Sequence, residues 1–289
     1  MDRSLEGAVV VVTGGAAGIG RATAGAMAEA GARVAIGDIH AEKAAEAAAE
    51  INSKASPGGE SATRGPVATG LPLDVTDRAG FDIFLDQVEE EFGPIDCLVN
   101  NAGVMLLGPI DEEDPEATRA MIDVNLVGVI NGTQAAMDRM KTRRRGRIVN
   151  IASQAGKAGM AGGATYCATK FGVIGFSEAV RAELKGSGVS ISWVLPGLVN
   201  TELAAGLPDI PLMDMLSPDD IAEAVVEALT GGGSEIWVPA RNQWLDAPAR
   251  LLPRSLRERV FALTGADKVL ADADAGRREQ YENRHSGSS

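Results

Sequence analysis

The sequence predicts an α/β fold in which one doubly wound parallel sheet lies between two layers of helices. Three observations support this prediction: a β-branched strand followed at once by a glycine-rich turn, further apolar strands that alternate with helices, and the length of the chain. With 289 residues the chain is long enough for one large domain and a terminal extension. We expect a single domain over residues 1–240 and a C-terminal helical extension over residues 241–289.

The first strand–helix–strand unit has the features of a dinucleotide-binding site. Residues 8–12 predict a buried parallel strand, and the glycine-rich turn of residues 13–20 follows it directly. We expect a helix over residues 21–30 and a second strand over residues 33–37, which Asp38 closes. Glycines let the backbone approach a pyrophosphate, and the free N–H groups of a helix N-terminus bind it. A carboxylate at the end of the second strand accepts hydrogen bonds from ribose hydroxyls.

The rest of the chain continues the alternation of strands and helices. A loop rich in Ser, Gly and Pro lies between Asn52 and Gly70, and a long helix that begins within residues 111–116 carries Asn125. The further predicted strands cover residues 71–75, 97–99, 147–151, 189–194 and 235–238. Because helices separate these strands, the sheet is expected to be parallel.

Tyr166 and Lys170 form a candidate proton-transfer pair. They are four positions apart, so on a helix they lie on one face, one turn apart. A phenol is a poor base at neutral pH because its unperturbed pKa is about 10, and a nearby ammonium lowers that pKa. Ser153 adds a hydroxyl that can hold a substrate oxygen beside the phenol. A solvated surface pair is the alternative, and the glycine-rich turn makes it the weaker explanation.

Three motifs together resemble the short-chain dehydrogenase/reductase family in its compact single-domain form. They are Thr13-Gly14-x-x-x-Gly18-x-Gly20, Asn100-Asn101-Ala102-Gly103, and Ser153 with Tyr166-x-x-x-Lys170. The resemblance implies a Rossmann fold of about seven strands and the reversible interconversion of an alcohol and a carbonyl compound. It implies that Tyr166 exchanges the proton, Lys170 lowers the pKa of Tyr166, Ser153 orients the substrate oxygen, and Asn125 holds a water that links Lys170 to solvent. The other explanation of Asn125 is a core amide with its hydrogen bonds satisfied.

The resemblance also implies the contacts with the cofactor. The expected residues are Gly14, Ala17, Gly18, Ile19, Gly20, Asp38, Ile39, Asp74, Val75, Asn101, Ala102, Gly103, Tyr166, Lys170, Pro196, Gly197, Val199 and Thr201. A carboxylate at Asp38 repels a ribose 2′-phosphate, and its neighbours Gly37 and Ile39 supply no compensating cation, so NAD is favoured over NADP. Asp74 has a second explanation, as the N-terminal cap of the helix expected over residues 77–92.

Composition excludes several other classes of protein. Lys and Arg number 27 and Asp and Glu number 40, and the net charge of −13 argues against nucleic-acid binding. Cys97 and Cys167 predict buried reduced thiols in a cytoplasmic protein rather than a disulfide framework. The apolar run of residues 8–12 is too short for a signal-peptide core or a membrane-spanning helix. The two histidines and scattered carboxylates lack metal-ligand spacing, so we expect no metal.

Apolar residues predict a hydrophobic substrate cleft. Met105, Leu106, Leu107 and Met160 are expected to line it, under a mobile lid formed by residues 203–216. We therefore expect a lipophilic secondary alcohol or ketone as substrate, rather than a sugar. The alternative function is a non-catalytic NAD-binding sensor or scaffold, but such proteins commonly lose the tyrosine or the lysine, and both are present here.

The C-terminal extension departs from the compact family form. We expect an Arg-rich amphipathic helix over residues 254–263 and a disordered end from Arg284 onward. Three explanations stay open: a helix docked on its own domain or on a partner subunit, a wall of the substrate cleft, or contact with a membrane surface. We expect a homodimer or a homotetramer, and the extension argues against the usual tetramer.

Overall fold

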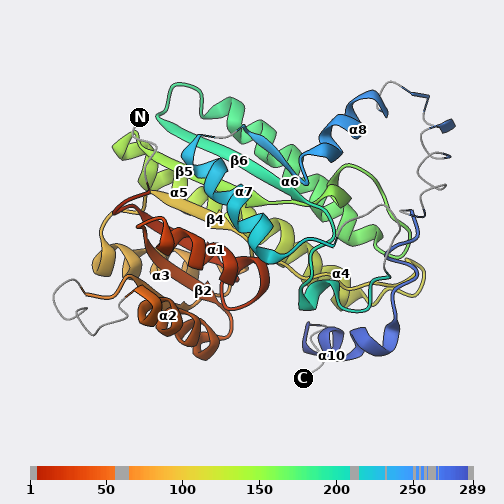
Figure 1. The fold of residues 1–289 in the computed structure, drawn as a ribbon, viewed down its shortest axis with the longest axis horizontal. Helices are drawn as coiled ribbons and strands as arrows, with labels where there is room; N and C mark the ends of the chain where they lie inside the picture. Colours follow the sequence, from red (N-terminus) through yellow and green to blue (C-terminus); the bar gives the residue numbers. More distant parts are fainter. Residues whose placement is uncertain are drawn as a thin grey trace.

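The protein is built on a seven-stranded, all-parallel Rossmann sheet, which confirms the predicted fold class. The computed structural model describes residues 5–55, 65–208, 215–231, 233–249 and 267–285, together with residues 252, 253, 255, 256, 259 and 265. The strand order is β3-β2-β1-β4-β5-β6-β7, so the direction of winding reverses between β1 and β4 (Figure 1). The strands are β1 (Val9–Thr13), β2 (Arg33–Asp38), β3 (Ala68–Pro72), β4 (Cys97–Asn100), β5 (Gly146–Ile151), β6 (Val189–Pro196) and β7 (Glu235–Val238).

Helices cover both faces of the sheet. One face carries α1 (Gly18–Glu29), α2 (Ala41–Ala55) and α7 (Pro218–Thr230), and the other carries α3 (Arg78–Phe92), α5 (Gly128–Arg143) and α6 (Ala164–Glu183) (Figure 1). Side chains alternate between these faces along each strand, so Val10 packs with the first set of helices and Val11 with the second. Both faces are therefore apolar, which explains why β1 is a continuous hydrophobic run.

The third strand begins earlier than the sequence pattern indicates. It was expected over residues 71–75 and lies at Ala68–Pro72. The side chain of Asn52 fixes its start, because Asn52 Oδ1 accepts hydrogen bonds from Val67 N and Ala68 N, and Asn52 Nδ2 donates to Ala68 O. Ala and Gly are weak strand formers, so hydrophobic pattern alone does not identify this start.

The long helix that carries Asn125 has three parts. It begins with α4 (Pro115–Ile122), which Asp114 caps by accepting a hydrogen bond from Glu116 N at 2.9 Å. A π-helical turn, η2 (Asp123–Val127), follows and contains Asn125, and the chain then continues directly into α5. Single π-helical turns inside long helices are frequent at functional sites.

The C-terminal part of the chain forms α8 (Arg241–Ala249) and α10 (Ala275–His285). The helix expected over residues 254–263 lies largely outside the described residues. Arg284 and His285, where the disordered end was expected to begin, are the last residues of α10, and the residues after them lie outside the described part of the chain. Figure 1 shows α10 in dark blue, beside the part of the molecule that carries α4.

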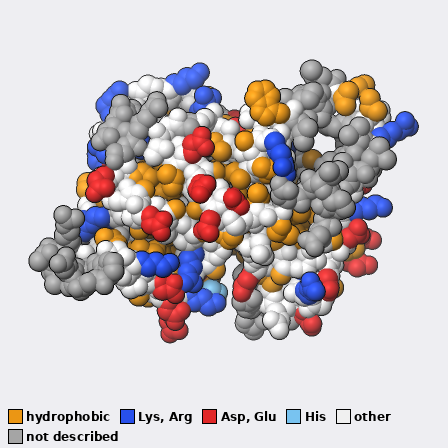
Figure 2. Space-filling view, viewed as in Figure 1, with side chains coloured by type: hydrophobic (Ala, Val, Ile, Leu, Met, Phe, Trp, Pro, Cys, Tyr) orange, Lys and Arg blue, Asp and Glu red, His pale blue; other side chains and the backbone are white. Residues whose placement is uncertain are grey.

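Acidic side chains gather over α7 on the face shown in Figure 2. The acidic residues of this helix are Asp219, Asp220, Glu223 and Glu227. These four carboxylates contribute to the net charge of −13, and their negative charge would repel the phosphate backbone of a nucleic acid. Among the described residues, no helix combines the length and the hydrophobicity that a membrane span requires.

Candidate active site

The candidate site lies at the carboxyl ends of β1 and β4, where the winding of the sheet reverses. Thr13 ends β1, and its Oγ1 accepts hydrogen bonds from Asn101 N at 3.0 Å and Ala102 N at 3.1 Å. In return, Asn101 Nδ2 donates to the carbonyl oxygens of Thr13 and Gly14 at 2.9 and 3.0 Å. These bonds fix the glycine-rich turn against the turn after β4. Open α/β sheets bind ligands at such a reversal.

The glycine-rich turn fits a pyrophosphate. Gly14 and Gly18 adopt φ values of 62° and 52°, which disfavour other residues. A Cβ on Gly20 would lie 2.2 Å from Gly14 O, so only glycine allows the turn to close on α1. The N-cap residue Ala17 makes no side-chain hydrogen bond, and the first turn of α1 has no acidic residue. The helix N-terminus, with Ile19 in its first turn, is thus suited to bind an anion.

Asp38 ends β2, and its carboxylate is held by two backbone N–H groups. Its Oδ2 accepts a hydrogen bond from Ala16 N at 3.1 Å, and its Oδ1 accepts one from His40 N at 3.0 Å. Each carboxylate oxygen keeps a second lone pair, which suits the hydroxyls of an adenosine ribose. The contact with Ala16, which the sequence did not reveal, also fixes the shape of the glycine-rich turn. Ile39 follows and is 68% exposed, so its side chain is accessible to a ligand.

Three side chains converge beyond β5 to form the candidate proton-transfer group. Ser153 caps the short 3-10 turn η3 (Gln154–Gly156), where its Oγ accepts a hydrogen bond from Ala155 N at 3.1 Å. Ser153 is also the neighbour whose hydrogen bonding lowers the pKa of Tyr166. Lys170 Nζ lies 5.7 Å from the centroid of the Tyr166 ring and donates to Ile151 O at 3.0 Å. Helix α6 carries Tyr166 and Lys170 one turn apart, as their spacing predicts.

Burial controls the protonation of this group. Only 7% of Tyr166 is exposed, and burial raises its pKa, while the hydrogen bond with Ser153 opposes part of the rise. Burial also lowers the pKa of Lys170 to about 8. The pKa of Tyr166 was expected to be lowered and is instead raised, because removal of the phenol from water outweighs the contribution of Ser153.

Asn125 is held by the protein itself. Its Oδ1 accepts a hydrogen bond from Val104 N, and its Nδ2 donates to Val104 O, both at 2.8 Å. Nδ2 also donates to Thr169 Oγ1 at 3.3 Å. The amide is therefore satisfied within the core, as the second explanation of Asn125 supposed. A Cβ on Gly103 would lie 3.2 Å from Asn125 Oδ1 and 3.8 Å from Lys170 Nζ, so both side chains border this turn.

Asp74 and Val75 follow β3, away from the catalytic group. Asp74 is exposed, and its Oδ1 accepts hydrogen bonds from Thr76 N and Thr76 Oγ1 at 2.9 and 2.7 Å. The expected alternative for Asp74, a cap of the next helix, is wrong. Asp77 caps α3 instead, by accepting a hydrogen bond from Ala79 N. Val75 is buried and packs against Gly128, where a Cβ would lie 2.7 Å from Val75 Cγ2.

The turn after β6 brings the remaining expected residues to the glycine-rich turn. Pro196 ends β6, and Gly197 N donates to Val238 O at 2.8 Å. Val199 pairs with Leu216 in an isolated bridge. Thr201 faces the start of α1, since a Cβ on Gly18 would lie 3.3 Å from Thr201 Cγ2. Thr201, after β6, therefore lies next to Gly18, at the start of α1, and both residues were expected to contact the cofactor.

A family model for short chain dehydrogenases matches residues 8–209. The chain belongs to this family. A D-threitol dehydrogenase from Mycolicibacterium smegmatis is 40% identical over 235 residues, which cover 78% of this chain and 86% of the relative. A 2,5-dichloro-2,5-cyclohexadiene-1,4-diol dehydrogenase from Sphingobium indicum is 35% identical, over 78% of this chain and 90% of the relative. A crystal structure of a short-chain type dehydrogenase/reductase from Mycobacterium marinum aligns with a TM-score of 0.72 and 29% identity, over 82% of this chain and 95% of that one.

Family membership makes this dehydrogenase an oxidoreductase of alcohols or ketones that uses a nicotinamide cofactor. The site contains the residue types that this chemistry requires, on rigid strand ends and helices.

The region around Tyr166 contains residues that the sequence analysis did not identify. A buried apolar cluster surrounds Tyr166, and Leu270 and Tyr281 from the C-terminal part of the chain belong to it. Its other buried members are Val104, Met105, Leu106, Ala117, Met121, Ala155, Cys167 and Val269. Met105 and Leu106 were expected to line a cleft, and Met160, also expected there, packs against this cluster. Leu270 and Tyr281 lie too far along the chain for a local pattern to indicate them.

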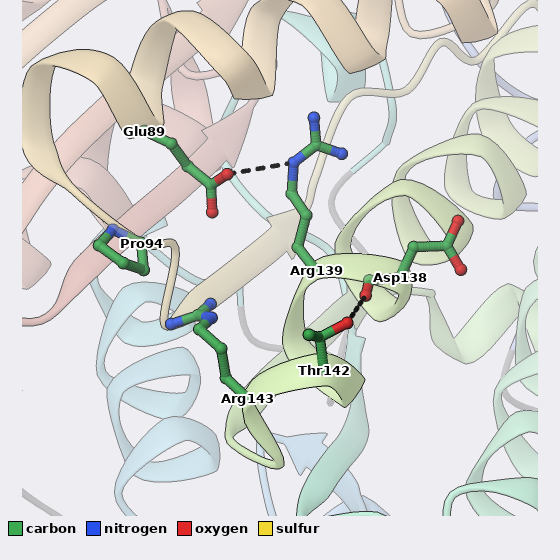
Figure 3. A pocket seen from close by; sticks show the side chains of 6 residues that line it. All are labelled: Glu89, Pro94, Asp138, Arg139, Thr142 and Arg143. Carbon is green, nitrogen blue, oxygen red and sulfur yellow. Dashed lines mark hydrogen bonds and ion pairs between the residues drawn. The ribbon is translucent and has the colours of Figure 1, made fainter.

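A surface hollow of about 520 Å³ lies on the opposite side of the dehydrogenase, near the amino end of β4. Figure 3 shows its lining, in which Glu89 on α3 faces Arg139 on α5. Arg139 Nε and Glu89 Oε2 are 3.4 Å apart, so these charges already neutralise each other. Because ligands of parallel sheets bind at the carboxyl ends of the strands, this hollow carries no assignment of function.

Proposed function

We propose that this dehydrogenase interconverts a lipophilic secondary alcohol and its ketone, with NAD as cofactor and Tyr166 as the proton-transfer residue. The observation that carries the proposal is the grouping of Ser153, Tyr166 and Lys170 beside the turn after β4, which Asn101 joins to the glycine-rich turn. A nucleotide-binding fold alone does not require a buried phenol next to a lysine. The grouping therefore favours catalysis over a non-catalytic sensor or scaffold.

Each residue of the group has a role in this reaction. NAD(H), held by the glycine-rich turn and Asp38, would supply the hydride chemistry when bound. During ketone reduction, Tyr166 donates its phenolic proton to the substrate oxygen, and during alcohol oxidation it takes that proton back. Ser153 holds the oxygen by a hydrogen bond that strengthens as negative charge develops on it. Lys170, when charged, stabilises the phenolate that remains after proton donation.

The carboxylate of Asp38 supports NAD rather than NADP. A ribose 2′-phosphate placed at the end of β2 would bring a second negative group next to Asp38, whose position is fixed by Ala16 N and His40 N. The hydroxyls of an unphosphorylated ribose can instead donate hydrogen bonds to both carboxylate oxygens. NAD is therefore the cofactor that we assign to this site.

The apolar cluster around Tyr166 supports a lipophilic substrate. A polyol would leave several hydroxyl groups against hydrocarbon, at a cost of about 1–3 kcal/mol for each unpaired group. The name of the Sphingobium relative specifies a compact cyclic diol, which agrees with this assignment. The name of the Mycolicibacterium relative specifies threitol and makes a polyol the competing substrate.

Absorbance of the reduced nicotinamide tests the proposal. Purified enzyme is assayed with NAD and with NADP against lipophilic secondary alcohols and against polyols. We expect turnover with NAD and lipophilic alcohols, and a loss of about 10²–10⁴-fold in kcat for Tyr166→Phe, which lacks the transferable proton. Faster turnover of polyols would refute the substrate class. Binding of NAD without turnover of any alcohol would favour the sensor.

A further inference from the structure

The C-terminal segment, residues 267–285, folds back over the candidate substrate site of its own chain. Ala161 N donates to Asp267 O at 2.9 Å, which joins the segment to the loop that leads into α6. Asp274 N donates to Gly206 O at 2.8 Å, which joins it to the loop after β6. The C-terminal segment therefore contacts loops on two sides of Tyr166. It lies entirely beyond the region that the family model matches.

Glycines at the start of α6 make room for this segment. A Cβ on Gly162 would lie 2.6 Å from Ala271 Cα, and one on Gly163 would lie 2.4 Å from Leu270 Cδ1. Gly163 is the N-cap residue of the helix that carries Tyr166. Leu270 is buried and shares the apolar cluster of Tyr166. The start of α6 and the C-terminal segment therefore pack so closely that no residue larger than glycine fits at Gly162 or Gly163.

Arg278 fastens the segment to the substrate loops. It is only 1% exposed, and it donates from Nη1 to Leu203 O and Ala205 O at 3.2 and 3.0 Å and from Nη2 to Met105 O at 2.6 Å. Its Nε donates to Glu282 Oε1 at 2.7 Å, so an adjacent carboxylate compensates its charge. These contacts occupy four of its five N–H groups with backbone and Glu282. Arg278 is therefore built to hold loops together rather than to bind an anionic substrate.

Tyr281 brings a second phenol into the apolar cluster. It is buried, and its hydroxyl oxygen accepts a hydrogen bond from Met105 N at 3.1 Å. Its proximity to Tyr166 also contributes to the raised pKa of Tyr166. Because Leu270 and Tyr281 share one cluster with a phenol that is almost fully enclosed, their volumes limit the space for a substrate beside Tyr166.

We propose that Leu270 and Tyr281 are specificity-determining residues, which complete the substrate site from the same chain and restrict it to compact hydrophobic secondary alcohols. Arg278 is a positioning residue, which holds these two side chains in place through the loops that it joins. This inference rests on the proposed function and deepens it, because it names the residues that select among alcohols.

A homologous series of alcohols tests the specificity role. We measure kcat/KM for NAD reduction with 2-butanol, 2-hexanol, 2-octanol and 2-decanol in wild type, Leu270→Ala and Tyr281→Leu. Each enlarged site is expected to raise the 2-decanol to 2-butanol ratio of kcat/KM by about 10-fold or more, because one methylene group in a hydrophobic pocket changes this quantity by about 10-fold at least. Leu270→Val removes less volume and is expected to shift the ratio in the same direction if Leu270→Ala proves unstable.

Arg277→Gln and Arg278→Gln form a matched pair for the positioning role. Arg277 lies on the same helix, but its side chain is 79% exposed and pairs only loosely with Asp274 at 3.7 Å. We expect Arg278→Gln to raise KM for all four alcohols by about 10-fold at similar kcat, because it loosens the wall without touching the proton-transfer group. Arg277→Gln is expected to leave both constants unchanged.

The outcomes separate this inference from the proposed function. If wild type oxidises these alcohols but Leu270→Ala and Tyr281→Leu keep its chain-length ratio, the specificity role is wrong and the proposed function stands. A wild-type preference for 2-decanol over 2-butanol would also overturn the compact substrate class. If wild type oxidises no alcohol of the series, the proposed function itself fails, and the inference fails with it.

Discussion

Two regions of this dehydrogenase are compared: the cofactor side, which is the glycine-rich turn with Asp38, and the substrate side, which is the apolar cluster around Tyr166. The contacts that hold these two regions join residues at very different separations in the sequence. On the cofactor side, Asp38 fixes the glycine-rich turn through Ala16, only 22 positions earlier in the chain. On the substrate side, Tyr281 and Met105 are 176 positions apart. The first arrangement depends on glycines and one carboxylate, and the second depends on a segment beyond the matched family region. The difference supports the division that we propose, in which the chemistry comes from the shared fold and the selectivity comes from the C-terminal segment.

The largest expected effect comes from a substitution in the glycine-rich turn. Gly20→Ala would place a Cβ 2.2 Å from Gly14 O, so the glycine-rich turn must move away from α1. We expect a loss of about 3 kcal/mol or more in the free energy of unfolding, together with loss of NAD binding. Urea unfolding measures the first quantity and titration calorimetry with NAD the second.

Gly25→Ala is the matched control for this prediction. Gly25 lies on the same helix, and a Cβ there meets no atom within 4 Å. Alanine is favoured over glycine in a helix interior by about 1 kcal/mol, so this variant is expected to be slightly more stable and to bind NAD normally. Equal behaviour of the two variants would show that the close approach of Gly20 does not matter.

A second prediction concerns Lys170, which lies between the two sides. Its pKa is 10.5 in ordinary surroundings and about 8 in the folded protein, so between these values the unfolded chain binds more protons. The charged amine therefore destabilises the fold fully below pH 8, and stability rises as the pH increases from 8 to 10.5. Across the whole window this corresponds to about 3 kcal/mol.

Comparison with Lys170→Met isolates this effect. We expect the free energy of unfolding of wild type to rise relative to that of Lys170→Met between pH 8 and pH 10.5, because methionine has no proton to lose. Urea unfolding at several pH values in this range gives the difference. Parallel curves for the two proteins would mean that burial does not perturb Lys170.

The comparison of the two sides also explains what the sequence could and could not predict. The motif around Gly14, Gly18 and Gly20 is local. Gly14 and Gly18 adopt positive φ values, and Gly20 packs closely against the carbonyl oxygen of Gly14. The Tyr166–Lys170 spacing likewise identifies one face of one helix. The alternation of strands and helices predicts the parallel, doubly wound sheet, and the structure adds the order of its strands.

Long-range packing limited prediction of the substrate side. Arg278 is followed by Glu279 and preceded by Arg277, a pattern that is typical of a solvated helix face, yet it is buried. Nothing near Tyr281 in the sequence indicates its contact with Met105. The direction of the Tyr166 pKa shift was missed for the same reason. Lys170 is a sequence neighbour, whereas the burial that dominates the shift involves residues far along the chain, such as Leu270 and Tyr281.

The smallest expected effect concerns the choice between NAD and NADP at Asp38. Asp38→Asn removes the negative charge but keeps an oxygen that can accept the hydrogen bond from Ala16 N, so the glycine-rich turn is expected to keep its shape. Loss of the charge removes the repulsion of a ribose 2′-phosphate, and we expect the preference for NAD over NADP to fall by about 10-fold, or about 1.4 kcal/mol. The ratio of kcat/KM with the two cofactors measures this preference. The chain-length selectivity for alcohols is expected to stay unchanged, because Leu270, Arg278 and Tyr281 act on the substrate side alone; a change in both properties would mean that the two sides are coupled.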